Sequence, residues 1–95
     1  MGDSRSAAAD HEEDVRLFCG RVEKLIKSKD PAVPLLKMFT ENRHLLNVLR
    51  LNSEERRLLE EVITKQGALI RSLLNWKYPP YGWEEDLTRV VQKHS

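Results

Sequence analysis

Apolar residues recur every three or four positions along most of this chain, which is the period of an amphipathic helix. The first such segment follows Asp10, which forms a capping-box pattern with Glu13, and it ends near the Lys-Ser-Lys-Asp at 27–30. Its apolar side consists of Val15, Phe18, Cys19, Val22, Leu25 and Ile26, and its opposite side carries Arg16, Arg21, Lys24 and Lys27. We therefore expect a first helix with a basic outer side.

Residues 30–51 carry a second helical pattern, which is interrupted in its middle. Asp30 followed by Pro31 is typical of a helix start, because proline tolerates the first helical position. A short apolar face around Leu36 and Phe39 follows, and Thr40–Asn42 interrupts the pattern before it resumes at Leu45. The segment predicts either two short helices or one helix with a kink.

The longest pattern covers about residues 54–76. Asn52 or Ser53 can cap its start, and Glu54 and Glu55 place negative charge in the first turn, where the helix dipole favours it. Its apolar side is about 160° wide, which is enough to contact more than one neighbour. We expect this helix to be the centre of the fold. A 3-4 spacing within it also permits a coiled-coil dimer, but the wide apolar side favours a bundle.

Tyr78-Pro79-Pro80-Tyr81 ends this helix, since each proline forces the preceding residue out of the helical conformation. Leu87, Val90 and Val91 then give a last helix. The predicted fold is all-α: a single domain over residues 11–95, with four to five helices around the long one and a flexible leader over residues 1–10. The predicted core consists of Val15, Phe18, Val22, Leu25, Leu36, Phe39, Leu45, Leu49, Leu59, Val62, Leu69, Leu73, Trp76, Leu87 and Val90.

Both tryptophans and both tyrosines lie within nine residues, Asn75 to Trp83. We expect the indoles of Trp76 and Trp83 to pack as a clasp that holds the last helix on the long one. The tyrosines flank the prolines on an irregular corner, where two large rings are hard to bury. The sequence therefore predicts a partner-binding surface at Tyr78, Pro79, Pro80 and Tyr81.

The net charge of +1 is small for a protein that binds nucleic acid, but it is unevenly distributed. Residues 16–50 contain eight Lys and Arg against three acids. A solvated outer face explains the basic side of the first helix most simply. A second interpretation is that Arg21, Lys24 and Lys27 contact an acidic protein partner, and binding of nucleic acid by residues 16–50 is an alternative to it.

Nothing in the sequence predicts a catalytic residue, a metal site or a cofactor. His11, His44 and His94 are far apart and have no ligand-type neighbour at metal-binding spacing. The lone Cys19 lies on an apolar helix side, as a structural thiol does. A single cysteine and the lack of a membrane-spanning apolar run favour an intracellular protein of the cytoplasm or nucleus.

One stretch resembles a known family. A short helix, "LLK" and then "LIRSLLNWK" (Leu69–Lys77) resemble the helical N-terminal domain of the transcription elongation factor that rescues arrested RNA polymerase. The chain departs from that pattern before the last helix, where "NVLRLNSEE" lacks the expected glycine and Leu-Arg-Lys-His run. The resemblance implies a small helical bundle associated with transcription.

We therefore expect a protein that is not an enzyme and that acts through protein–protein contact, as an adaptor or small subunit of a larger complex. A nucleic-acid, chromatin or transcription-associated module is the alternative, and homo-oligomerisation is compatible with either.

Overall fold

The computed structural model describes the backbone of residues 3–95 and the side chains of residues 10–95. Four helices make up the described chain: α1 (Asp3–Lys27), α2 (Val33–Val48), α3 (Ser53–Leu73) and α4 (Trp83–Lys93). The fold is thus all-α, as predicted. Residues 30–51 contain a single helix, α2, which runs from Val33 to Val48 without a break at Thr40, whose hydroxyl donates to the carbonyl of Leu36.

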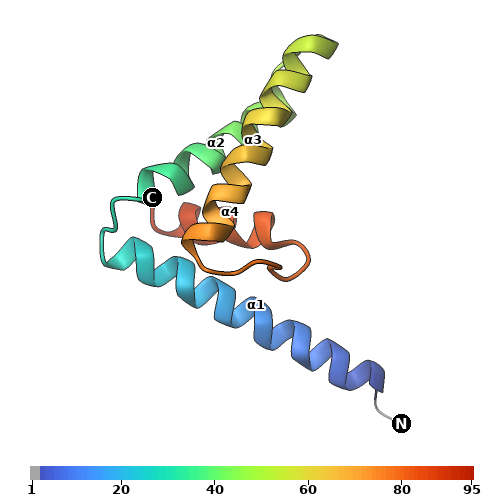
Figure 1. Ribbon diagram of the computed structural model, residues 1–95, viewed down its shortest axis with the longest axis vertical. Coiled ribbons are helices and arrows are strands. Elements are labelled where there is room, and N and C mark those ends of the chain that lie inside the picture. Colours follow the sequence, from blue (N-terminus) through green and yellow to red (C-terminus); the bar gives the residue numbers. More distant parts are fainter. Residues whose placement is uncertain (1–2) are drawn as a thin grey trace.

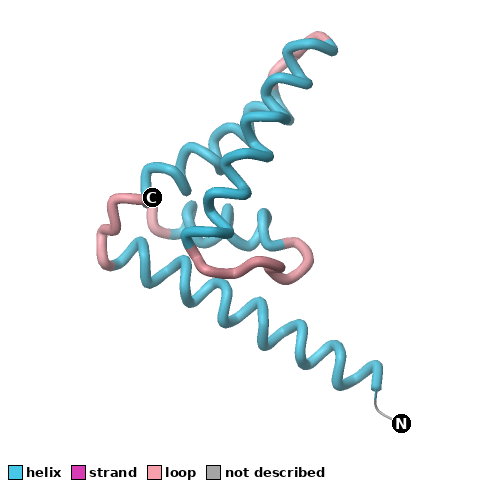
Figure 2. The backbone as a smooth tube through the Cα atoms, viewed as in Figure 1, coloured by secondary structure: helices cyan, strands magenta, loops and turns pink. Residues whose placement is uncertain are grey.

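The helices associate as two pairs (Figures 1 and 2). α1 packs mainly against α4, and α2 packs against α3 and also touches α4. The prediction of a long central helix fits this arrangement only loosely. α3 covers most of the expected residues 54–76, but the 25-residue α1 is longer, and the main neighbour of α3 is α2 alone.

The starts of α3 and α2 differ in how the preceding polar residue bonds to the backbone. Asn52 caps α3 as predicted: its side chain accepts from the amide of Glu55, and the Glu55 carboxylate accepts from the amide of Asn52. Asp30 does not cap α2, which begins at Val33; its carboxylate accepts from the amide of Ala32 and tightens the preceding turn.

α1 and α3 end in the same way. Lys29 and Asn75 adopt left-handed backbone angles, and the next amide reaches back to the carbonyl of Leu25 or Arg71. This Schellman motif stops α3 at Leu73, three residues before the predicted end.

α1 begins at Asp3, before the predicted start at Asp10. The flexible leader over residues 1–10 stays a prediction, because residues 1–2 lie outside the described residues and only the backbone of residues 3–9 is described.

The core lies where the four helices meet. Six predicted core residues are buried there: Phe18, Val22, Leu36, Phe39, Leu87 and Val90. Ile70, Leu74 and Val91 are buried as well, although the sequence analysis did not include them in the core. The predicted Val15, Leu25, Leu45, Leu59 and Trp76 are half-buried.

Four core predictions are wrong, because Leu49, Val62, Leu69 and Leu73 are exposed. Leu49 caps the far end of α2, and for the three residues of α3 the reason is the side that this helix turns inward. A Cβ atom on Gly67 would lie only 3.5 Å from the rings of Phe39 and Trp83, so both rings lie directly over this glycine. The helix therefore buries the side that contains Gly67 and Ile70. Leu58, Val62, Leu69 and Leu73, on the other part of its wide apolar side, face outward.

The distal halves of α2 and α3 project away from this core (Figure 1). We call residues 41–65 the arm and the remaining described residues the body. Within the arm no residue is buried. At its base the amide of Asn42 donates to the side-chain oxygen of Gln66 at 3.0 Å. The molecule is accordingly elongated, with extents of 49 × 34 × 22 Å.

Candidate functional site at the aromatic corner

The two tryptophans pack around a phenylalanine of α1. Phe18 meets Trp76 and Trp83 edge to face, with ring centroids 5.7 and 6.0 Å away. On the other side, Trp83 stacks on Phe39 of α2 at 5.6 Å. The predicted indole clasp is present only in part: the two indoles meet through Phe18 of α1, and α4 packs mainly on α1 and α2 rather than on the long helix α3. Such aromatic pairs add about 0.5–1.5 kcal/mol each beyond the area they bury.

Arg21 reaches from α1 to the other face of this cluster. Its guanidinium donates to the carbonyl of Leu74 at 2.9 Å and lies 4.6 Å from the ring centroid of Trp76. It thus satisfies a carbonyl at the end of α3 and stacks on an aromatic ring. The structure brings this predicted site residue next to the corner.

At the corner, the prolines and the tyrosines differ in burial. Pro80 is buried and Pro79 is half-buried, whereas Tyr78 and Tyr81 are 77% and 93% exposed. The carbonyl of Pro80 accepts from the amide of Trp83, and Gly82 takes a left-handed angle before α4 begins. The prolines therefore fix the bend, and the tyrosines are the side chains available to a partner.

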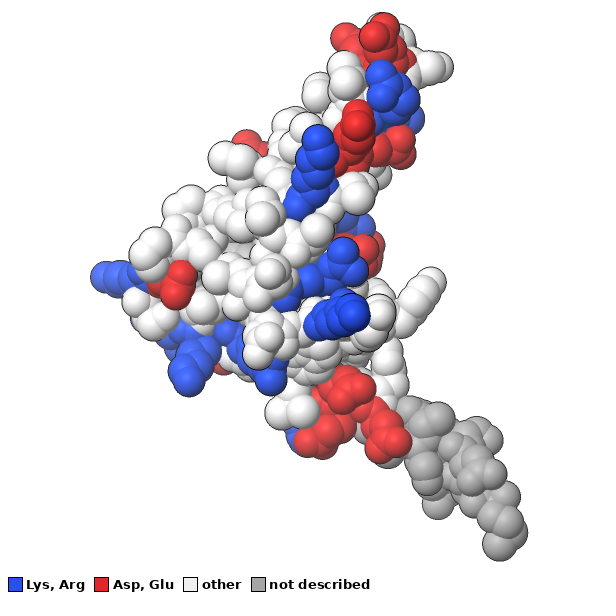
Figure 3. All heavy atoms as spheres, viewed as in Figure 1, with Lys and Arg blue, Asp and Glu red and all other residues white. Residues whose placement is uncertain are grey.

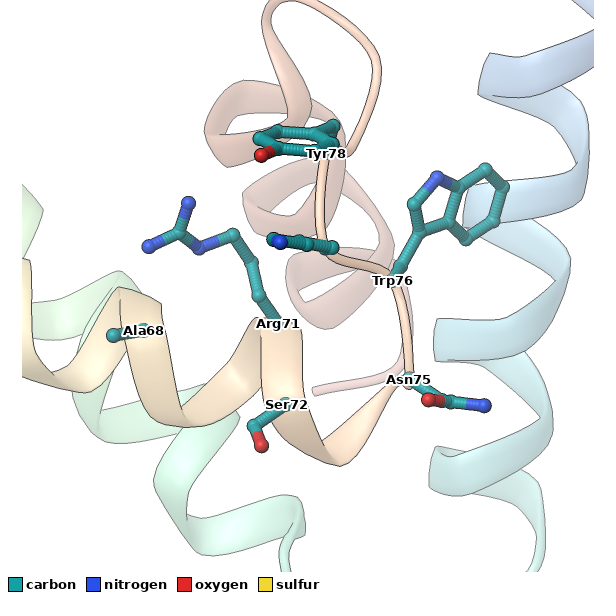
Figure 4. A pocket seen from close by; sticks show the side chains of 7 residues that line it. Ala68, Arg71, Ser72, Asn75, Trp76 and Tyr78 are labelled. Atoms are coloured by element: carbon teal, nitrogen blue, oxygen red, sulfur yellow. The ribbon is translucent and has the colours of Figure 1, made fainter.

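Tyr78 borders a pocket of about 420 Å³ between the end of α3 and the corner (Figure 4). Its lining consists of Ala68, Arg71, Ser72, Asn75, Trp76, Lys77 and Tyr78, and we call it the Tyr78 pocket. Figure 4 shows the Arg71 side chain on the same side of the chain as Tyr78, while the indole of Trp76 turns toward α1. Two cations and no acid line it.

Tyr81 borders a different hollow on the α4 side of the corner. Glu84 and Glu85 line it together with Arg43. The Arg43 guanidinium donates to Glu85 at 2.7 Å, and this bond holds the pKa of Glu85 below its usual value. The only cation lining this hollow is therefore already paired.

Lys24 and Lys27, the other predicted contact residues, lie in the last turn of α1. Lys27 is 3.6 Å from the carboxylate of Glu23, and the structure does not bring either lysine into the lining of the Tyr78 pocket. Glu23 also accepts from His94 at 3.1 Å. The hydrogen bond from His94, followed by the charge of Lys27, lowers the pKa of Glu23. This cluster ties the end of α4 to α1.

Two further kinds of group bear on chemistry, the lone thiol and the possible metal ligands. Cys19 is half-buried, and its desolvation raises the pKa of the thiol, which keeps the less nucleophilic protonated form. Within the described part of the chain, no three His, Cys, Asp or Glu side chains come together as metal ligands. None of the described helices is both long and apolar enough to cross a lipid bilayer.

The sequence analysis missed Arg71 and Lys77 as site residues. Helical spacing gives no signal for them, because the chain leaves the helix after Leu73 and the left-handed Asn75 sets its later course. The chain matches no protein-family model, no curated protein and no solved structure in the comparisons made with each.

Proposed function

We propose that this protein is a non-catalytic protein–protein interaction module, an adaptor or small subunit of a larger intracellular complex in the cytoplasm or nucleus. The observation that carries the proposal is an apolar stripe along α3, formed by Leu58, Val62, Leu69 and Leu73. These four side chains recur at helical spacing on one side and are 39–59% exposed. We call them the α3 stripe.

Exposure of these four apolar side chains to water is unfavourable. Covering four half-exposed aliphatic side chains contributes about 4 kcal/mol, at about 1 kcal/mol for each half-buried side chain. Apolar groups gathered on one exposed helix side are typical of contact surfaces between proteins. A second copy of the chain paired through α3, as in a coiled coil, would cover the stripe as well as a different partner would.

Charge supports a protein partner over nucleic acid. Among the basic residues at 16–50, Arg16, Lys27 and Arg43 form ion pairs with acids, and Arg21 binds a carbonyl. Basic side chains gather near the C-terminal end of α1, while red and blue side chains alternate along the arm (Figure 3). Nucleic-acid binding by residues 16–50 remains the alternative, and a steep salt dependence of duplex binding would favour it.

The test compares two variants that add the same charge to the same helix. Leu69→Glu places a carboxylate in the α3 stripe, and Thr64→Glu places one on an exposed position outside it. Each variant serves as bait for affinity capture with mass spectrometry, and light scattering measures its mass. We expect Leu69→Glu to lose about tenfold or more of a captured partner, or of a self-associated dimer, that Thr64→Glu retains.

Circular dichroism provides the folding control, since both substituted positions are exposed. The proposal is wrong if the wild-type protein is monomeric and captures nothing, or if both variants retain the same proteins equally.

A further inference from the structure

The two exposed tyrosines of the corner stand in opposite electrostatic surroundings. Tyr78 borders a pocket lined by Arg71 and Lys77 and by no acid. Tyr81 borders a hollow lined by Glu84 and Glu85, whose one cation is paired. Only Pro79 and Pro80 therefore separate an aromatic side chain beside positive charge from one beside negative charge.

The cations of the Tyr78 pocket are available to a ligand. Neither Arg71 nor Lys77 belongs to an ion pair within residues 10–95. Lys77 lies with its ammonium 5.3 Å from the ring centroid of Tyr78, which leaves its hydrogen atoms free for an acceptor. Arg21, on the other side of Trp76, adds a third positive charge nearby.

The end of α3 does not compete for these cations. Helix C-termini carry partial negative charge on unpaired carbonyls, which would attract Arg71 or Lys77. Here the carbonyls of Arg71 and Ser72 accept from the amides of Trp76 and Asn75, and that of Leu74 accepts from Arg21. The Schellman motif and Arg21 thus occupy three of the carbonyls at this helix end.

We propose that the Tyr78 pocket binds an acidic segment of a protein partner, with its carboxylates on Arg71 and Lys77 and an apolar side chain against the ring of Tyr78. Guanidinium and ammonium groups form their strongest hydrogen bonds with carboxylates, and an exposed tyrosine beside them supplies apolar contact area. The proposal rests on the proposed function and names the partner's chemistry at a site separate from the α3 stripe.

The probe is a fluorescent twelve-residue peptide of Asp and Glu around one central leucine, with a Lys counterpart of the same length. Fluorescence anisotropy measures its dissociation constant at low and at physiological salt. We expect the acidic peptide to bind, the Lys peptide not to bind, and the affinity to fall with salt because the site is open to solvent.

Two cation variants test the site. Arg71→Ala and Lys77→Ala should each weaken binding about tenfold, and Arg71→Lys should restore part of the loss of Arg71→Ala. Arg56→Ala is the matched control, because it removes the same charge from the same helix about 22 Å away at 1.5 Å per residue. Equal losses for Arg56→Ala and Arg71→Ala would show non-specific attraction and overturn the proposal.

The tyrosine pair gives a second control within the corner. Tyr78→Ala should weaken binding about fivefold, whereas Tyr81→Ala should leave it within twofold. Thermal melts confirm that each variant is folded. No binding of the acidic peptide to wild type, equal effects of the two tyrosine variants, or equal displacement by a single-stranded oligonucleotide or inorganic phosphate would each overturn the proposal.

The outcomes separate this inference from the proposed function. Leu58→Glu, at the end of the stripe about 20 Å from Arg71 at 1.5 Å per residue, should bind the acidic peptide as wild type does, because it is remote from the pocket. A partner captured through the α3 stripe while the peptide fails to bind would overturn only the inference about the Tyr78 pocket.

Discussion

The body and the arm share α2 and α3, but these helices are packed very differently in the two regions. In the body, α3 buries Gln66, Gly67 and Ile70, and Gly67 lies against aromatic rings from two other helices. In the arm, the first half of α3 has only α2 beside it, and Leu58 and Val62 remain 44–49% exposed. A two-helix hairpin can cover only one side of each helix, so the same apolar pattern that forms a core in the body forms a surface in the arm.

The largest expected difference between the two regions concerns side-chain truncation. Phe18→Ala removes the ring that both indoles contact and should lower the free energy of unfolding by about 3–5 kcal/mol. Leu58→Ala, at a 49% exposed position of the arm, should cost under about 1 kcal/mol. Urea denaturation followed by circular dichroism measures both. Similar costs for the two would contradict the division into body and arm.

Gly67 tests how closely the body is packed. At Gly67 even an added Cβ atom would lie 3.5 Å from Phe39 and Trp83. Gly67→Leu inserts a much larger side chain there and should lower the free energy of unfolding by about 1–3 kcal/mol. Gly20→Leu is the control, because nothing lies within 4 Å of a Cβ at that helical position. Denaturant melts that show equal effects would mean that Gly67 does not determine which side α3 buries.

Removal of the cap at Asn52 tests whether the arm unfolds separately from the body. Asn52→Ala removes an acceptor for the amide of Glu55 and should cost about 1 kcal/mol. Because the arm holds no buried residue, hydrogen exchange should accelerate most at the first turns of α3 and less in the body. Ser53→Ala, next to the cap, should change little. Uniform acceleration along the chain would show that the arm and the body unfold together.

The smallest expected effect is the pH dependence of the contact between α1 and α4. The pKa of Glu23 is lowered in the folded protein, so its stabilising contribution is full above the unfolded pKa of about 4.3. That contribution is lost as pH falls through the lower folded pKa. When the pH is lowered from neutral to below the folded pKa of Glu23, the Tm of Glu23→Gln should therefore fall less than the Tm of the wild type.

Glu60→Gln is the matched control in the arm, because Glu60 is exposed and forms no ion pair among the described residues. Its Tm should fall with acid as the wild type's does. Identical acid profiles for Glu23→Gln and wild type would remove the Glu23–His94 contact from the account of stability.

The candidate site was predictable in part. The prolines identify the bend, and two tyrosines on an irregular corner were expected to be exposed, as Tyr78 and Tyr81 are. The pairing of Tyr78 with Arg71 was not predictable from helical spacing alone. It depends on the left-handed Asn75 and on the Schellman motif that folds the corner back over the last turn of α3. The contact of Tyr78 and Tyr81 with a partner stays a prediction.

What the sequence by itself determined is local: the helical periods, the Asn52 cap, the Pro-Pro break and the burial of Phe18, Leu36 and Leu87. Those features follow from interactions within a few residues or from a narrow apolar side. The tertiary structure alone decided which part of α3's wide apolar side is buried, because Ile70 and Leu69 are equally apolar neighbours. Phe39 and Trp83 settle over Gly67, where no side chain stands in the way, so Ile70 lies inside and Leu69 outside.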